Sequence, residues 1–286
     1  MIQRLHRGWL AAGLRLRPAR SLDRLARAFF RVRGGRASPE EREVLAAGTP
    51  ARLRIGPHDV AVRVFGAGPV VLLAHGWNGH AGQLAPLVEP LVRDGHRVVA
   101  FDFPGHGDSS GTHLTVTEMA EGVEAVARWA GEIRAVVAHS LGSVAVARAV
   151  DRGLRVDRLV FLAPAVAPRQ WVRAVAKLSG LPNSWRPAFE QAVERRAGAP
   201  LDDVDLRVLG PRMHVPLLVV HDAADRYVPA SQIHSLLRAW PRSTQMRTSG
   251  LGHFRVLRDD RVIAAVRQFV APGSSSASSR YPTVHG

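Results

Sequence analysis

The chain has 286 residues, 46% of them hydrophobic, which is enough for one large α/β domain or two small ones with a substantial core. It contains no cysteine, so disulfides, thiolate metal sites and a cysteine nucleophile are excluded. No apolar run approaches the roughly 20 residues of a membrane-spanning helix, and the N-terminus lacks the pattern of a secretory signal. We therefore expect a cytoplasmic protein.

The net charge of +15 is concentrated near the N-terminus. Residues 1–42 hold eleven arginines against Asp23, Glu40 and Glu41, and Lys177 is the only lysine of the chain. Such a charge favours an anionic partner, but no helix-turn-helix, zinc-finger or RNA-binding motif accompanies it. We therefore expect no nucleic-acid binding.

The first predicted element is an amphipathic helix that begins near Ser21. Its apolar residues recur at helical spacing, while arginines lie on the other side. These apolar residues are Leu22, Leu25, Ala26, Phe29 and Phe30. The helix is expected to pack on the surface of the domain, and a weak contact with an anionic membrane is the alternative.

A second helix and a β-hairpin are expected next. Residues 38–41 (Ser-Pro-Glu-Glu) have the capping-box pattern with proline in the first turn, and this helix should end near Ala47. Alternating apolar residues on both sides of the turn at 56–59 predict two antiparallel strands. We assign residues 1–48 to a basic helical extension.

From Val70 onward, short apolar strands alternate with helical segments, as in a mainly parallel sheet with helices on both faces. The predicted strands span residues 70–74, 97–101, 135–139, 158–163, 217–221 and 245–248. The predicted helices span residues 82–93, 117–130, 141–152, 230–239 and 259–270. We assign residues 49–271 to this domain and the serine-rich residues 272–286 to a disordered tail.

One interval, residues 164–213, breaks this alternation because it contains no predicted strand. Its helical stretches carry Trp171, Trp185 and Phe189. About fifty residues are too many for an ordinary connection, so we expect a helical lid over a pocket at the carboxyl edge of the sheet. Extra helices that touch no substrate are the alternative.

Residues 135–143 (Ala-Val-Val-Ala-His-Ser-Leu-Gly-Ser) predict a strand, a tight turn and a helix that present Ser140 as a nucleophile. The residues two before and two after such a serine must be small. Ala138 and Gly142 meet this requirement, although glycine is usual at the first of the two positions.

A serine nucleophile also needs a base and a carboxylate that orients the base. Asp225 follows one predicted strand and His253 follows the next, which gives the chain order Ser, Asp, His. Asp222 lies close to Asp225 and is the alternative for the acid.

Four motifs, in order along about residues 52–270, resemble those of the α/β-hydrolase superfamily. They are His75-Gly76-Trp77, Asp102 to Ser109 (D-x-x-G-x-G-x-S), Ala138 to Gly142 (G-x-S-x-G with one substitution), and Asp225 to Pro229 with Gly252-His253. The resemblance implies an α/β-hydrolase fold with a mostly parallel central sheet, N-terminal helices and a helical lid insertion.

The resemblance also implies roles for five residues. Ser140 is the nucleophile, His253 is the general base and then the acid, and Asp225 orients His253. The backbone amides of Trp77 and Leu141 form the oxyanion hole, which stabilises the charge of the tetrahedral intermediate.

The chain is thus similar to small bacterial esterases and monoacylglycerol-lipase-like hydrolases, which implies cleavage of a carboxylic ester through an acyl-enzyme. His139, Trp171, Trp185 and Phe189 are expected at the substrate pocket, and the aromatic rings favour an apolar acyl group. Alternatives are thioesterase, lactonase, peptidase or cofactor-free peroxidase chemistry, and a non-catalytic, membrane-associated binding protein.

No cofactor and no metal are expected. His75, His80 and His106 could be imagined as zinc ligands, but the sequence has no metal-ligand spacing such as H-E-x-x-H. The expected partner is a small-molecule ester, and the oligomeric state stays open.

Overall fold

The computed structural model describes residues 16–271 and contains an eight-stranded sheet with the order β1-β2-β4-β3-β5-β6-β7-β8. The strands are β1 (Thr49–Ile55), β2 (His58–Phe65), β3 (Val70–Ala74), β4 (Arg97–Phe101), β5 (Ile133–His139), β6 (Val156–Leu162), β7 (Leu217–Asp222) and β8 (Ser243–Thr248). Strands β3 to β8 run parallel, and β1 and β2 pair antiparallel at one edge. The predicted mainly parallel sheet with an opening hairpin is confirmed.

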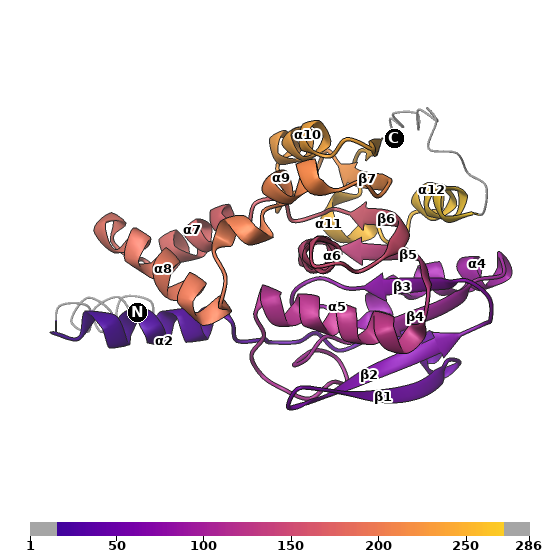
Figure 1. Ribbon diagram of the computed structural model, residues 1–286, viewed down its shortest axis with the longest axis horizontal. Coiled ribbons are helices and arrows are strands. Elements are labelled where there is room, and N and C mark those ends of the chain that lie inside the picture. Colours follow the sequence, from indigo (N-terminus) through magenta and orange to yellow (C-terminus); the bar gives the residue numbers. More distant parts are fainter. Residues whose placement is uncertain (1–15, 272–286) are drawn as a thin grey trace.

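Helices cover both faces of the sheet (Figure 1). One face carries α5 (Val116–Ala130), α6 (Leu141–Asp151) and α10 (Ala230–Ala239), and the other carries α4 (Val88–Arg93) and α12 (Asp260–Val270). Alternate residues of one strand enter opposite cores: Val70 and Leu72 of β3 pack on the first face, and Val71 and Leu73 on the second. This two-sided burial explains why the strands read as continuous apolar runs.

The helix predicted at residues 82–93 differs from expectation in its first half. It begins as a 3₁₀ helix, η1 (Ala81–Leu87), and becomes α-helical only in α4. Pro86 lies inside η1 and Pro90 lies in α4. Proline has no backbone N–H to donate, so one continuous α-helix cannot run through both positions with its full set of hydrogen bonds.

Residues 164–213 form only helical elements after β6. They are α7 (Pro168–Leu178), η2 (Asn183–Trp185), α8 (Arg186–Ala197), η3 (Leu201–Val204), α9 (Leu206–Leu209) and η4 (Gly210–Arg212). We call this segment the helical insertion. Figure 1 shows α7 and α8 together with α2 (Pro18–Phe29) to one side of the sheet and its two covering layers. We call α2, α7 and α8 the helical arm.

The apolar stripe of α2 packs against the helical insertion. Leu22, Ala26 and Phe30 are buried in one cluster with residues of α7 and α8, and the Phe29 and Phe189 rings meet edge to face at 6.3 Å. The helix begins at Pro18, three residues before the predicted start, because proline suits the first helical turn. The stripe therefore contacts protein and is not available to a membrane.

The next helix, α3 (Pro39–Ala46), has the predicted capping box. Ser38 Oγ accepts a hydrogen bond from the Glu41 amide at 3.2 Å, and the Glu41 carboxylate accepts one from the Ser38 amide at 2.8 Å. Among residues 16–271 no helix is long and apolar enough to cross a membrane. The predicted tail at residues 272–286 and the first fifteen residues of the predicted extension lie outside the described residues.

Candidate active site

Ser140 lies on a sharp turn between β5 and α6. Its φ and ψ angles are 50° and −122°, a region that residues with a side chain rarely adopt. The turn is held by the neighbouring strand, because the Ser140 amide donates to the Leu162 carbonyl and its own carbonyl accepts from the Ala165 amide, each at 3.1 Å. The strain is thus offset by bonds to the end of β6 and to the loop that follows it.

Small residues let this turn pack tightly against the end of β3. A Cβ atom on Gly142 would lie 2.4 Å from the His75 carbonyl oxygen, which is far inside contact distance. A Cβ atom on Gly76 would lie 2.9 Å from Cβ of Ser140. Ala138, where glycine is usual, is fully buried in the sheet core, so its methyl group is accommodated.

The side chains of Ser140, His253 and Asp225 form one hydrogen-bonded chain. His253 Nε2 lies 3.0 Å from Ser140 Oγ, and His253 Nδ1 lies 2.8 Å from Asp225 Oδ2. The three residues follow β5, β7 and β8, and His253 sits on a short helix, α11 (Gly252–Arg255). Because these strands are parallel, their carboxyl ends bring the three residues to one edge of the sheet.

The side chain of Asp225 is buried, but its carboxyl group stays ionised. Burial raises its pKa, yet the hydrogen bonds from His253 and from the amides of Tyr227 and Val228 outweigh burial, so the pKa lies below its usual value. The two amides donate to Oδ1 at 2.8 and 3.0 Å and leave Oδ2 for His253. A proton on His253 Nδ1 therefore faces Asp225, and Nε2 is left to accept the Ser140 hydroxyl proton.

Asp222, the alternative acid, does not reach His253. Its carboxylate accepts hydrogen bonds from the Ala224 amide at 2.8 Å, Thr248 Oγ1 at 2.7 Å and the Leu251 amide at 3.0 Å. These bonds tie the end of β7 to the end of β8 and to the loop that carries His253. The geometry therefore favours Asp225 as the acid and gives Asp222 a positioning role.

His139 is a buried, neutral imidazole directly before Ser140. Burial, followed by the proximity of His253, lowers the pKa of His139 to about 3. Its Nε2–H donates to the backbone carbonyl of His253 at 3.1 Å, and the two rings lie 4.8 Å apart. The bond connects the turn that holds the nucleophile to the backbone of the base.

His75 shapes the loop that carries Trp77. Its Nε2 accepts a hydrogen bond from the Phe103 amide at 3.0 Å, and its Nδ1–H donates to the Gly76 carbonyl at 2.7 Å. Since one ring nitrogen accepts and the other donates, the ring is neutral, and burial lowers its pKa well below the usual value.

His106 supports the same loop from the other side. Its Nε2 accepts from the Asn78 amide and its Nδ1–H donates to the Pro104 carbonyl, each at 3.0 Å. Burial lowers the pKa of His106 to about 4. Both ring nitrogens of His75 and of His106 are thus engaged with the backbone, which leaves neither ring a free lone pair for a metal.

The backbone amides of Trp77 and Leu141 remain the predicted oxyanion hole. Leu141 is the first residue of α6, so its N–H has no acceptor within the helix. Trp77 follows Gly76, whose contact with Ser140 brings the loop against the nucleophile. Both residues line the cavity at the serine.

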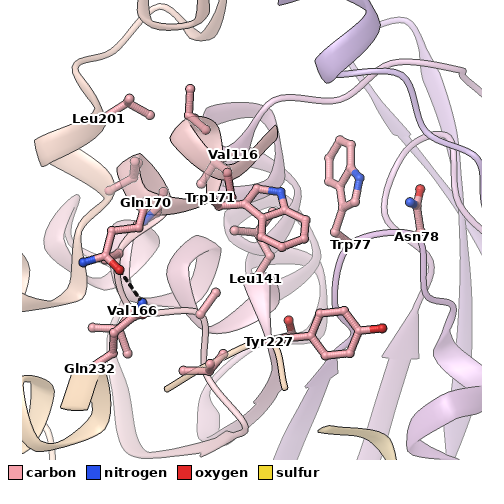
Figure 2. Close-up of a pocket in the computed structure, with 18 of the residues that line it drawn as sticks. Trp77, Asn78, Val116, Leu141, Val166, Gln170, Trp171, Leu201, Tyr227 and Gln232 are labelled. Carbon is pink, nitrogen blue, oxygen red and sulfur yellow. Dashed lines mark hydrogen bonds between the residues drawn. The ribbon is translucent and has the colours of Figure 1, made fainter. Parts of the chain in front are cut away.

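A cavity of about 640 Å³ opens beside Ser140, within the size range of small-molecule sites. Its wall is mostly apolar and combines the sheet domain, the helical insertion and α2. Figure 2 labels several of the lining residues, among them Trp77, Val116, Leu141, Val166, Trp171 and Leu201. Beside them, Gln232 Nε2 of α10 donates to Gln170 Oε1 of α7 at 2.7 Å and links the insertion to the sheet domain (Figure 2).

Two of the four residues expected at the pocket lie elsewhere. His139 and Trp171 line the cavity, but Trp185 and Phe189 do not. Phe189 is buried against Phe29, and Trp185 packs on the same cluster, because α2 supplies their apolar partner. Helical spacing marks such residues as inward-facing without indicating which neighbour they meet.

Phe29 and Phe30 line the cavity and were not expected there. They stand where α2 ends, in the segment that we assigned to an N-terminal extension. Their apolar stripe was the only signal in the sequence, and its partners in the insertion lie far along the chain.

Comparison with known proteins places the chain among hydrolases. The family model described as serine aminopeptidase, S33, matches residues 67–198. A pimeloyl-[acyl-carrier protein] methyl ester esterase of Xanthomonas axonopodis pv. citri is 28% identical over 73% of this chain and 98% of that protein.

Solved structures share the same architecture. An esterase from Exiguobacterium antarcticum matches with a TM-score of 0.63 and 17% identity, over 78% of this chain and 99% of its own. A membrane phospholipase A, a bacterial virulence factor, matches with a TM-score of 0.62 and 19% identity, over 91% and 94%. The chain has the α/β-hydrolase fold. In this α/β-hydrolase, the residues that match the superfamily's motifs meet at the carboxyl edge of the sheet.

The neutral histidines make the stability of this α/β-hydrolase depend on pH. The pKa of His106 is about 4 in the folded protein and about 6.5 in an unfolded chain. Between these values the unfolded chain binds more protons, so the free energy of unfolding decreases as the pH falls from 6.5 towards 4. His106 alone contributes a loss of about 3 kcal/mol, measurable by urea denaturation at several pH values.

A His106→Gln variant lacks this titration and is expected to show a shallower pH dependence. His234→Gln is the control, because His234 is exposed on α10. Equal slopes for wild type and His106→Gln would contradict the expectation.

Proposed function

We propose that this α/β-hydrolase cleaves a carboxylic ester with an apolar acyl group through an acyl-enzyme intermediate. The observation that carries the proposal is the hydrogen-bonded chain from Ser140 through His253 to Asp225 at the wall of a mostly apolar cavity. A serine hydroxyl is a weak nucleophile unless a base accepts its proton, and His253 Nε2 lies within reach.

In the proposed reaction, Ser140 Oγ attacks the carbonyl carbon while His253 Nε2 takes the hydroxyl proton. The amides of Trp77 and Leu141 donate to the oxyanion that forms. His253 then gives the proton to the leaving alcohol, which leaves the acyl group on Ser140. A water molecule next attacks the acyl carbonyl carbon while His253 takes its proton, and His253 returns this proton to Ser140 Oγ as the acid is released. Asp225 stays ionised and stabilises the imidazolium in both steps.

An ester is favoured over a peptide substrate by the charges at the cavity. The matching family is described as serine aminopeptidase, whose name denotes peptides with a free amino terminus. Among the residues that line the cavity within 16–271, no aspartate or glutamate is present to pair with such an ammonium group. A desolvated ammonium without a counter-charge is unfavourable, so an uncharged acyl group fits better. The esterase names of the curated relatives agree with this choice.

The acyl chain is expected to extend from Ser140 towards the helical arm. This part of the wall comes from the end of α2 with the residue after it, from α8 and from η3, and all its residues are apolar: Phe29, Phe30, Val193, Ala197, Leu201 and Val204. Each methylene that moves from water into such a wall contributes about 0.8 kcal/mol, or roughly fourfold in binding.

The nucleophile is tested by Ser140→Ala with a fluorophosphonate probe and p-nitrophenyl butyrate. Loss of the hydroxyl should abolish labelling and lower kcat by at least about a thousandfold. Ser143→Ala, which alters a buried serine one turn further along α6, is the matched control. Labelling of Ser140→Ala at the wild-type level would exclude this nucleophile.

The acid is tested by comparing Asp225→Asn with Asp222→Asn. Asp225→Asn removes the charge that orients His253, and kcat should fall by about 10⁴-fold. Asp222→Asn keeps the side-chain volume and does not touch His253, so its loss of kcat should be far smaller. The reverse ranking would assign the acid to Asp222.

The acyl site is tested by measuring kcat/KM over p-nitrophenyl esters of increasing acyl length. Phe30→Ala enlarges the cavity wall, so the preferred acyl chain should become longer by a few methylenes. Phe189→Ala removes a ring from the same apolar cluster, but Phe189 does not line the cavity, so the preference should stay unchanged. Equal shifts in both variants would show that arm stability, and not the wall, sets the preference.

A further inference from the structure

The face of α2 that points away from the protein carries a row of arginines. Arg20, Arg24 and Arg27 follow one another at steps of four and three residues, which places them on one side of the helix. Arg17 and Arg31 continue this spacing just beyond the two helix ends. All five are exposed, and we call them the arginine row.

The arginine row has no carboxylate partner in the described part of the chain. Asp23, the acidic residue of α2, pairs instead with Arg196 of α8 at 3.5 Å. Like charges three and four residues apart destabilise a helix, so the row works against the folding of α2 unless an anionic partner balances it.

His113 lies near the inner end of the row, where its backbone pairs with Arg31. Burial, followed by the charges of Arg27, Arg196 and Arg31, lowers the pKa of His113 below its usual value. Arg196 belongs to α8 and its charge is balanced by Asp23, so Arg27 and Arg31 are the arginines near His113 that belong to the row.

Exposed leucines lie at the outer end of the helical arm. Leu16 lies two residues before the first residue of α2 and is 81% exposed, and Leu178 ends α7 and is 80% exposed. Figure 1 shows the start of α2 and the end of α7 at the same outer end of the arm. Leu16 neighbours Arg17 of the arginine row in the chain. A row of cations with an exposed apolar side chain at its end suits a lipid surface, because headgroups meet the charges and hydrocarbon meets the leucine. A nucleic acid has no hydrocarbon layer that an exposed leucine could contact.

We propose that the arginine row docks this protein on an anionic phospholipid surface. The contact differs from insertion of an amphipathic helix, because the apolar stripe of α2 is already buried against α8. Phe29 at the end of this helix and Phe30 directly after it line the cavity, so docking brings the cavity close to the bilayer. A lipid ester as substrate follows only if the proposed function holds, whereas docking does not depend on it.

Docking is tested by co-sedimentation with phosphatidylcholine vesicles, with and without phosphatidylglycerol. The protein carries Ser140→Ala, so that no lipid is consumed and the result is independent of catalysis. Binding is expected only with phosphatidylglycerol and should weaken as salt is raised. Arg20→Gln/Arg24→Gln/Arg27→Gln should weaken it on the order of a hundredfold.

The matched control removes three exposed arginines from other surfaces: Arg128→Gln/Arg155→Gln/Arg247→Gln. It should bind within about twofold of the parent, because the loss of charge is equal but the arginine row is intact. Equal weakening by both variants, or none by the first, would overturn the proposal. Tighter binding to duplex DNA than to the vesicles at the same salt would assign the row to nucleic acid instead.

Discussion

The backbone strain at Ser140 is the constraint on which the site depends. A residue with a side chain sits where glycine is the usual occupant, and it stays there because Leu162 at the end of β6 bonds to its amide and Ala165 in the following loop bonds to its carbonyl. Gly142 and Gly76 then allow the turn to approach the end of β3 closely enough for the Trp77 loop to face the serine. A turn without this packing relaxes, and the hydroxyl then no longer points at His253.

Three neutral histidines fix the backbone around the catalytic residues. His75 and His106 fix the Trp77 loop, and His139 joins the nucleophile turn to the backbone of His253. Burial lowers the pKa of all three rings and keeps them neutral. His75 and His106 each use one ring nitrogen as a donor and the other as an acceptor, whereas His139 is fixed through Nε2 alone. The ionised Asp225 can then act on a single histidine, because the other rings near the serine do not compete for its charge.

The sequence predicts those features that are determined by neighbouring residues in the chain. The limits of β3, β4 and α10 agree with those observed, since apolar runs and breakers mark them, and the triad residues follow from motifs at strand ends. The sequence does not predict how helices that are distant in the chain pack against each other. Phe189 and Phe30 both read as inward-facing residues of amphipathic helices, yet only Phe30 reaches the cavity. The difference depends on how α2 lies against α8, and no local pattern encodes that. The sequence also does not predict the change from 3₁₀ to α-helix near Pro86. The helix at residues 82–93 is predicted from the spacing of its apolar residues, without regard to the backbone N–H that proline lacks.

The packing of α2 against α8 has a consequence for how the chain matures. During synthesis α2 emerges early, while α8 and its partners follow only after most of the sheet strands. Contacts between segments so far apart in the chain close large loops and form late in folding. The apolar stripe of α2 is therefore uncovered in a nascent chain and is a site for self-association until α8 arrives. The cavity wall that α2 completes is thus among the last parts of the molecule to assemble.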